Sequence, residues 1–471
     1  MNNHGAGIQK LIKSGWVILT LGFIFPLKGC KQSNPSELKI YCNVNVADIT
    51  PKEPLFLAGF ANRSGMSESV HRPLKTQCLA LRQNNNTICM IFNDLMEVTP
   101  DIVEEITQRT SDKTGLAQDR IFIHSIHTHS APVMDNMGLE HSEVNDCYRK
   151  EVIKTIAANA VKTLNDSTVF TPFRISTGRS TCDINVNRRA YDPDTGETII
   201  GKSSEGRCDK EVGIVQLSDE TGKSIVTLFN YACHPVTLGY ESQAVSPDYI
   251  GRAREVIEQN RGGIAVFMNG AAGDINPVRG LGASTELADA EGEILGNAVI
   301  SARLNEESAP SIQIRTGTIE LPYRDQNITS EQIDRIVIDK SKEETEFLTW
   351  KQDVHQWGSK MKDLLKKGEL NNYRKMKTGV VRLGPALIFF TQGEIFNTYQ
   401  TILKKSFPDQ TILFAGYTNG ESGYLPDKEA FFFGGYEIEQ AYIYIGEPSP
   451  LTPEAEKIFL DHAREQIKSV F

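Results

Sequence analysis

Residues 121–132 read IFIHSIHTHSAP, and the interpretation of the whole chain starts from this stretch. An apolar run ends here in two histidines, His127 and His129, two positions apart. Alternate side chains of an extended strand share one face, so the spacing predicts that both histidines point the same way at the end of a strand. Neutral imidazole is the commonest protein ligand for zinc. The alternative is a pair of exposed histidines at a strand end.

Two later stretches with a similar composition favour a site over that alternative. Residues 230–235 read NYACHP and include His234, and residues 267–277 read FMNGAAGDINP. Both are apolar runs that break into small and polar residues, as expected where the strands of an α/β sheet end at a site. Glu394 follows a further apolar strand. Two histidines and a glutamate are a common catalytic zinc set, which leaves a coordination position open for water.

The order of patterns along the chain predicts an α/β fold. Apolar strands alternate with amphipathic helices, but hairpins intrude, so we expect a mixed β-sheet core with flanking helices in a single large catalytic domain, residues 38–450. The charged segment 330–370 is predicted to be a projecting helical insertion, opened by Thr329 and Gln332 as a capping box. Residues 451–471 are predicted to form a C-terminal helix. Other expected helices cover about 99–110, 145–164, 248–259, 286–304 and 394–405.

Composition and the first residues bear on location and partners. The chain has 471 residues with a net charge of −10, which argues against a nucleic-acid partner. Residues 1–29, with two lysines before an apolar run, resemble a bacterial lipoprotein signal peptide that is cleaved before Cys30. Acylation of Cys30 and a polar tether over 30–37 would anchor the protein to a bacterial membrane outside the cytoplasm. An uncleaved anchor and a plain secretory signal are the alternatives, and both also place the body outside the cytoplasm.

The eight cysteines lie in the first half of the chain, at 30, 42, 78, 89, 147, 182, 208 and 233. Without Cys30 an odd number remains, so a complete disulfide framework is excluded. Cys182 and Cys208 flank a polar loop and are placed to pair in an oxidising compartment.

The motifs HTHSAP (127–132), NYACHP (230–235) and GDINP (273–277) resemble, in this order, those of the neutral/alkaline (non-lysosomal) ceramidases. The resemblance extends over about residues 38–450 and includes Asn187-Arg188 and Gly393-Glu394. It implies a zinc-dependent hydrolase that cleaves an N-acyl amide in a sphingolipid such as ceramide.

The resemblance also implies roles for individual residues. Zinc would be held by His127, His234, Glu394 and a C-terminal tyrosine, for which Tyr444 is favoured over Tyr442. His129 would contact the reacting group and serve as the acid/base candidate. Arg188 would help to position the substrate carbonyl.

Asn276 departs from the family pattern, which carries a catalytic serine at this position. An amide is neither a nucleophile nor a proton shuttle, but it can hold the substrate or stabilise an oxyanion. Water activated by zinc would then be the nucleophile. We also expect the C-terminal β-sandwich domain of the family to be absent. These departures leave two alternatives: hydrolysis of a bond in a glycan or glycoconjugate, and a non-catalytic surface lipoprotein that binds a ligand.

Three further residues are candidates for the surroundings of the site. Asp94 and Asp274 are expected to orient the histidines as carboxylate partners, or else to cap strand–loop junctions. His71 is expected to line the cleft, or else to lie in a loop. His124, on the apolar strand before the pair, is expected to be buried.

Overall fold

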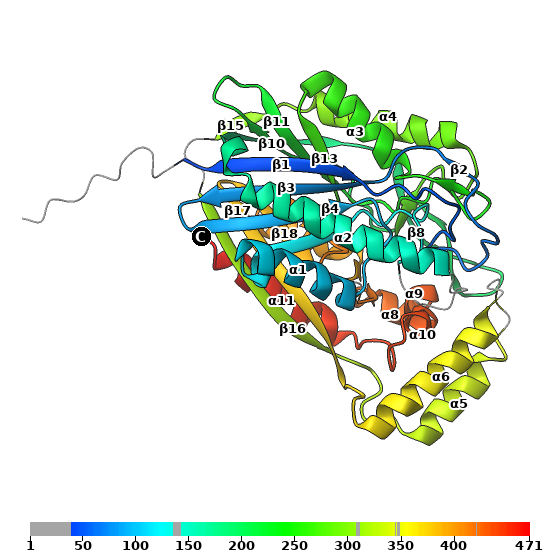
Figure 1. The fold of residues 1–471 in the computed structure, drawn as a ribbon. Coiled ribbons are helices and arrows are strands. Elements are labelled where there is room, and N and C mark those ends of the chain that lie inside the picture. The colour runs from blue at the N-terminus through cyan, green and yellow to red at the C-terminus, as the bar shows by residue number, and fades with distance from the viewer. Residues whose placement is uncertain (1–38, 135–142, 308–310, 344, 346–348, 421) are drawn as a thin grey trace, which may run out of the picture.

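The computed structural model describes residues 39–471 except 135–142, 308–310, 344, 346–348 and 421. Three units with the order strand–strand–helix–strand build its core (Figure 1). In each unit the first two strands are antiparallel and the last strand lies parallel to the second. The units are β3 (Lys75–Gln83), β4 (Asn86–Asn93), α1 (Pro100–Thr114) and β5 (Ile121–Ser125); β10 (Glu211–Ser218), β11 (Ser224–Tyr231), α3 (Tyr249–Arg261) and β13 (Ile264–Asn269); and β17 (Tyr373–Leu383), β18 (Ala386–Thr391), α7 (Asn397–Ser406) and β20 (Thr411–Ala415).

Further strands extend each unit into a mixed sheet. The first sheet has the order β5-β4-β3-β1-β6, the second β13-β11-β10-β7-β15 and the third β16-β17-β18-β20. Smaller sheets join β14 to β8 and β9, β19 to β21, and β12 to β2. The added strands are β1 (Tyr41–Asp48), β2 (Ser69–Val70), β6 (Thr171–Pro172), β7 (Arg174–Thr181), β8 (Asn185–Tyr191), β9 (Thr198–Ser203), β12 (Ala244–Val245), β14 (Ile275–Pro277), β15 (Asn305–Glu307), β16 (Ile312–Pro322), β19 (Glu394–Ile395) and β21 (Tyr424–Leu425).

Helices cover the outer faces of the three sheets, and one hydrophobic cluster fills the space between them. Helices α1 and α2 (Glu143–Asn165) lie outside the first sheet, α3 and α4 (Thr285–Ser301) outside the second, and α11 (Glu454–Lys468) against β16 and β17 (Figure 1). The shared cluster includes Phe92 from the first sheet, Leu228 and Met268 from the second, and Ile388 and Leu413 from the third. Burial of these apolar faces fixes the arrangement of the sheets.

Buried polar side chains lock the carboxyl ends of the parallel strands together. At the end of β11, the Asn230 amide donates to the Met268 and Phe414 carbonyls, each at 2.8 Å. On β5, His124 Nδ1 lies 2.9 Å from the Gly416 carbonyl, and the backbone N–H of Asn269 donates to His124 Nε2 at 3.0 Å. The ends of strands from all three sheets therefore meet at one place.

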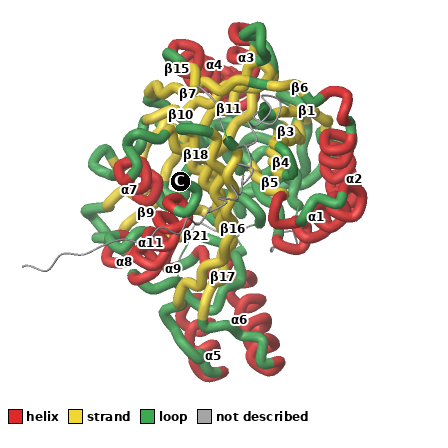
Figure 2. The backbone as a smooth tube through the Cα atoms, turned by 90° about the vertical axis from the view of Figure 1, so that its left-hand side faces the viewer, coloured by secondary structure: helices red, strands yellow, loops and turns green. Residues whose placement is uncertain are grey.

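Helices α5 (Ser330–Lys340) and α6 (Trp350–Lys367) form an antiparallel pair that projects beyond the ends of β16 and β17 (Figures 1 and 2). The capping box of Thr329 and Gln332 opens α5, as the sequence predicts. The pair packs on the short helix α10 (Ala441–Tyr444), which follows α8 (Ala430–Phe433) and α9 (Tyr436–Glu439).

The mixed sheet and the α/β class are confirmed, but some local predictions are wrong. Glu394 does not open a helix: it lies in β19, paired in parallel with β21, and the helix begins at Asn397. Cys182 and Cys208 are free thiols, as are the other cysteines of the described chain. The predicted signal peptide, Cys30 and the tether lie outside the described residues. None of the helices that the structure describes has both the length and the apolar character required to cross a bilayer.

Candidate metal centre

His127, His234 and Glu394 come together where the three sheets meet. His127 follows β5, His234 follows β11 and Glu394 follows β18, so each core unit contributes one of them. Glu394 Oε2 lies 3.3 Å from His127 Nε2 and 3.0 Å from His234 Nε2. Both histidines and the glutamate are buried.

Backbone carbonyls fix the proton on each imidazole. His127 Nδ1 lies 3.0 Å from the Met96 carbonyl, and His234 Nδ1 lies 2.7 Å from the Ala272 carbonyl. A carbonyl oxygen can only accept, so Nδ1 carries a proton in both rings, and in the neutral ring the lone pair is therefore on Nε2. Burial, and to a smaller extent the charge of Arg188, lower the pKa of His234 to about 4, so the imidazole is neutral at neutral pH. Two lone pairs and a carboxylate oxygen thus face one another, which is favourable when a cation binds among them.

His129 is the third histidine of the cluster. One ligand atom from each of His127, His129 and His234 fits a group in which all three atoms lie within 4.8 Å of one another. Both ring nitrogens of His129 are covered and have no hydrogen-bond partner in the described protein. The Phe60 ring packs edge-on against it at 4.9 Å. A β-carbon on Gly59, whose φ is +95°, would overlap the imidazole, so this loop holds the ring from one side.

The two histidines converge for a different reason from the one predicted. β5 ends at Ser125, and His127 has a φ of 69°, which no extended strand adopts. The left-handed turn brings the two rings to a centroid distance of 5.1 Å. Tyr417, which sequence reasoning missed, stacks on the His127 ring at a centroid distance of 4.3 Å.

The two predicted tyrosines pack among the aromatic side chains of α6. Tyr444 packs on Trp350 at 5.4 Å and Tyr442 on Trp357 at 5.9 Å, in the cluster beneath α5 and α6. Tyr436, which precedes both of them, is also buried: burial raises its pKa, and Glu394 adds to that effect. Two positive-φ glycines, Gly434 and Gly435, precede Tyr436 and turn the chain there.

Arg188 reaches the edge of the cluster from β8. Its Nη1 lies 3.4 Å from His234 Nε2, its Nη2 donates to the Tyr424 hydroxyl at 3.1 Å, and its Nε donates to Glu437 at 2.9 Å. Burial alone would lower the pKa of Arg188, but Tyr424 and Glu437 outweigh it and raise the pKa well above the usual value. The guanidinium is therefore a permanent cation held in a fixed orientation.

Asn276 lies on β14, which pairs with β8 beside Arg188. Asn276 is 7% exposed. Its Oδ1 is buried and has no hydrogen-bond partner in the described part of the protein. A buried amide oxygen without a hydrogen bond is costly, and a water molecule or a ligand would satisfy it.

Comparison with known proteins identifies the family of this chain. A model of the N-terminal part of the neutral/alkaline non-lysosomal ceramidases matches residues 42–294, which is more than half of the chain. The chain belongs to this family. Two solved structures have the same fold: the neutral ceramidase from Pseudomonas aeruginosa and a ceramidase complexed with C2. Each has a TM-score of 0.63 and 12% identity, and each match covers 92% of this chain. The matches cover 75% and 76% of those two chains, respectively.

Family membership makes the protein a ceramidase-like hydrolase.

Two aspartates that were expected to orient the histidines hold other parts of the chain together instead. Asp94 forms a buried two-pronged ion pair with Arg254, at 2.8 and 2.6 Å. Asp274 accepts hydrogen bonds from the Asn187 side-chain amide and from the backbone N–H of Asn397, each at 2.7 Å. Both carboxylates tie segments together, whereas carbonyls orient the imidazoles.

His71 and His124 lie in two further environments. His71 Nδ1 bonds the Ser246 hydroxyl at 2.9 Å and its Nε2 lies 3.0 Å from Asp289, so it belongs to an ion-pair group outside the histidine cluster. His124 is fully buried, as expected, and joins the ends of strands without facing the cluster.

Proposed function

We propose that the protein is an extracytoplasmic, zinc-dependent, ceramidase-like hydrolase that cleaves an N-acyl amide bond with zinc-activated water. The observation that carries this proposal is the convergence of two imidazole lone pairs on the Glu394 carboxylate, with each Nδ1 committed to a backbone carbonyl. Neutral histidines held in this way are ready-made ligands for a divalent metal.

The donor set fits zinc. His127, His234 and Glu394 would hold the ion, with Tyr436 as the fourth ligand in place of Tyr444. Such an ion polarises a carbonyl and lowers the pKa of bound water to about 7.

The other residues have roles that follow from their contacts. His129 has two covered ring nitrogens without protein partners, so one can take a proton from the attacking water and return it to the leaving amine. Arg188 Nη1 is directed toward the cluster and would donate to the substrate carbonyl oxygen as negative charge develops. Asn276 Oδ1 would accept from an N–H or O–H of the substrate.

The proposed substrate class follows from the family, and the proposed location follows from the first residues of the sequence. An N-acyl lipid is the substrate class that the family suggests, and one family-fold structure holds a ligand named C2. Lipid anchoring at Cys30 rests on the first residues of the sequence alone. A Cys30→Ala variant that stays in the membrane fraction would contradict it.

Metal content tests the proposal directly. We expect about one zinc per chain in the purified protein, measured by elemental analysis, and loss of that zinc in a His127→Ala/His234→Ala double variant. His355→Ala is the matched control, because His355 is exposed on α6 and should leave the zinc content unchanged. Hydrolysis of a short-chain ceramide should follow the zinc content. A wild-type protein that binds no zinc, even when zinc is added, would favour a non-catalytic binding lipoprotein.

A further inference from the structure

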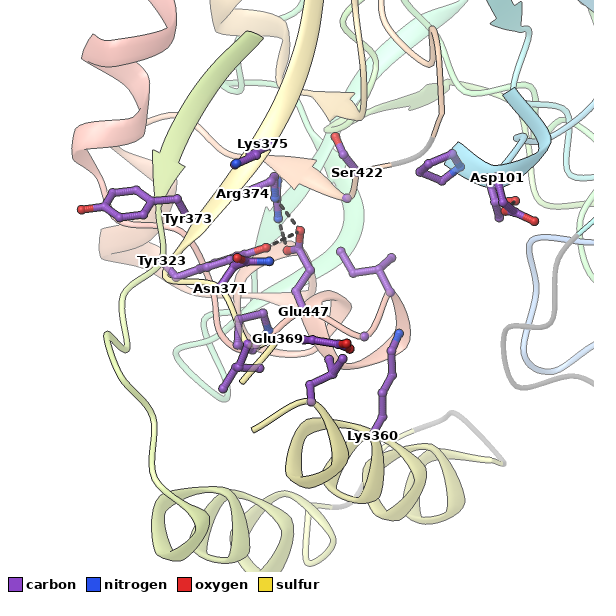
Figure 3. Close-up of a pocket in the computed structure, with 18 of the residues that line it drawn as sticks. Asp101, Tyr323, Lys360, Glu369, Asn371, Tyr373, Arg374, Lys375, Ser422 and Glu447 are labelled. Carbon is purple, nitrogen blue, oxygen red and sulfur yellow. Dashed lines mark hydrogen bonds and ion pairs between the residues drawn. The ribbon is translucent and has the colours of Figure 1, made fainter. Parts of the chain in front are cut away.

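Four arginines are buried in the part of the chain that the structure describes, and three of them pair with a carboxylate. The three pairs are Arg374–Glu447, Arg254–Asp94 and Arg188–Glu437. Figure 3 shows the first of them, which lines a cleft beside α6. Arg63 is the exception, because its guanidinium has no carboxylate partner among the residues that the structure describes.

Three backbone carbonyls surround the guanidinium of Arg63 in place of a carboxylate. Its Nη1 donates to the Ala58 carbonyl at 2.8 Å and to the His129 carbonyl at 2.6 Å, and its Nη2 donates to the Gly239 carbonyl at 3.1 Å. Burial lowers the pKa of Arg63 to about 10, so the side chain is charged at neutral pH. A charge is costly to bury, and the planar fork of an arginine offsets part of that cost by donating to several acceptors. One buried cation therefore joins three loops, and one of these loops carries His129.

The imidazole of His129 is held differently from those of the two proposed ligands. His127 and His234 each direct Nδ1 to a backbone carbonyl, whereas neither ring nitrogen of His129 has a hydrogen-bond partner in the described protein. The orientation of this ring therefore depends on its backbone and on the groups that pack against it. A residue that transfers protons needs available nitrogens, but it must also stay in a fixed position.

Arg63 contributes to both supports of His129. Its Nη1 holds the His129 carbonyl, and its guanidinium carbon lies 4.9 Å from the centre of the Phe60 ring. Phe60 in turn packs edge-on against the imidazole, with the two ring centroids 4.9 Å apart. The same segment is tied to the loop of His129, because the backbone N–H of Ala58 donates to the Ala131 carbonyl at 2.9 Å. Removal of the guanidinium would loosen the backbone and the ring packing together.

We propose that Arg63 is the positioning residue that holds His129 at the metal centre. The inference rests on the proposed function and deepens it, because it assigns the support of the acid/base candidate to a residue outside the zinc ligand set. The imidazoles of His127 and His234 are oriented by carbonyls that Arg63 does not contact, so its loss should leave the metal ligands in place.

Kinetics and metal binding together test this role. In Arg63→Met, kcat for a short-chain ceramide should fall at least about tenfold, because the proton-transfer group is displaced. KM should change less than about threefold, and zinc affinity should not change. Arg63→Lys keeps the charge but loses the fork, so its kcat should lie between the two, and this variant is informative even where the methionine variant does not fold. A wild-type kcat in either variant, or a parallel loss of zinc, would overturn the inference.

Arg261→Met is the matched control. Arg261 also donates to three backbone carbonyls, but these lie at the end of α4 and just after it, where the arginine joins α4 to the end of α3. Its loss removes the same number of carbonyl contacts outside the metal centre, so kcat should stay at the wild-type value. A fall in kcat equal to that of Arg63→Met would show that loss of stability, and not the position of His129, lowers turnover.

A spectroscopic measurement separates this inference from the proposed function. In metal-free protein with ¹³C-labelled histidine, the Cε1–Hε1 signal of His129 is assigned from its absence in His129→Gln. It should be narrow in wild type and broadened or doubled in Arg63→Met, whereas the signal of His124, which is held by Gly416 and Asn269, should stay the same. An unchanged His129 signal would overturn the inference whatever the protein hydrolyses. A disturbed signal in a protein that hydrolyses no N-acyl lipid would uphold the positioning role and refute the amidase.

Discussion

Acid should destabilise this protein through His124, and one substitution isolates the effect. His124 is 0% exposed, and its Nε2 accepts from the Asn269 amide at 3.0 Å while Nδ1 faces the Gly416 carbonyl at 2.9 Å. A proton on Nε2 would face another N–H group, so only the neutral ring fits. Burial lowers the pKa of His124 to about 3, and His127 contributes in the same direction.

The sign and size follow from that shift. An unfolded histidine titrates near pH 6.5, so between about pH 3 and 6.5 the unfolded chain binds one proton more than the folded chain at this site. The stability that His124 contributes is therefore fully present above pH 6.5 and is lost as the pH falls. The loss is about 1.4 kcal/mol per pH unit, or about 2 kcal/mol between pH 6 and 4.5.

Urea unfolding at pH 7.5, 6 and 4.5, in the presence of a metal chelator, measures this loss. His124→Gln should be less stable than wild type at pH 7.5 by about 1–3 kcal/mol, because its buried hydrogen bonds are remade imperfectly. It should lose about 2 kcal/mol less than wild type between pH 6 and 4.5. His355→Gln, at an exposed position, should behave as wild type. Equal acid losses in His124→Gln and wild type would refute the reasoning.

Three further predictions concern the centre and its support. Tyr436→Phe should weaken zinc binding at least about tenfold in a competition titration, whereas Tyr444→Phe should leave it unchanged; the reverse result would restore the original assignment. Gly59→Ala should lower turnover about 100-fold with an unchanged circular dichroism spectrum, because the new methyl group displaces the His129 ring; full activity would show that the loop yields. Asp94→Asn should cost about 3–5 kcal/mol in urea unfolding, because it leaves the arginine partner buried and unpaired; a cost below about 1 kcal/mol would contradict this.

Local signals in the sequence predicted much of the fold. Thr99 and Pro100 begin α1 and Gly115, with a φ of 72°, ends it, as their residue types indicate. Strands without a clear apolar alternation were missed: β8, residues 185–191, reads NVNRRAY and is held by its neighbours in the small sheet. Its pairing is a tertiary effect that no local pattern carries.

The site residues could be predicted where a sequence motif follows a strand. They could not be predicted where their position depends on backbone turns or on backbone carbonyls. The motifs located His127, His234 and Glu394, and the fold brings these three together. The choice between Tyr436 and Tyr444 depends on how three short helices turn, which spacing does not reveal. The carbonyls that orient the imidazoles belong to Met96 and Ala272, and any residue type would supply them.

The origin of the three central side chains in three separate units has a consequence for folding. No single unit, and no pair of units, contains the set, so a partly synthesised or truncated chain cannot assemble it. The long loops between the units must close before these side chains meet, which makes the centre one of the last features to form. Catalytic competence is then an all-or-none property of the finished fold, and activity is a direct report of correct assembly of the whole chain.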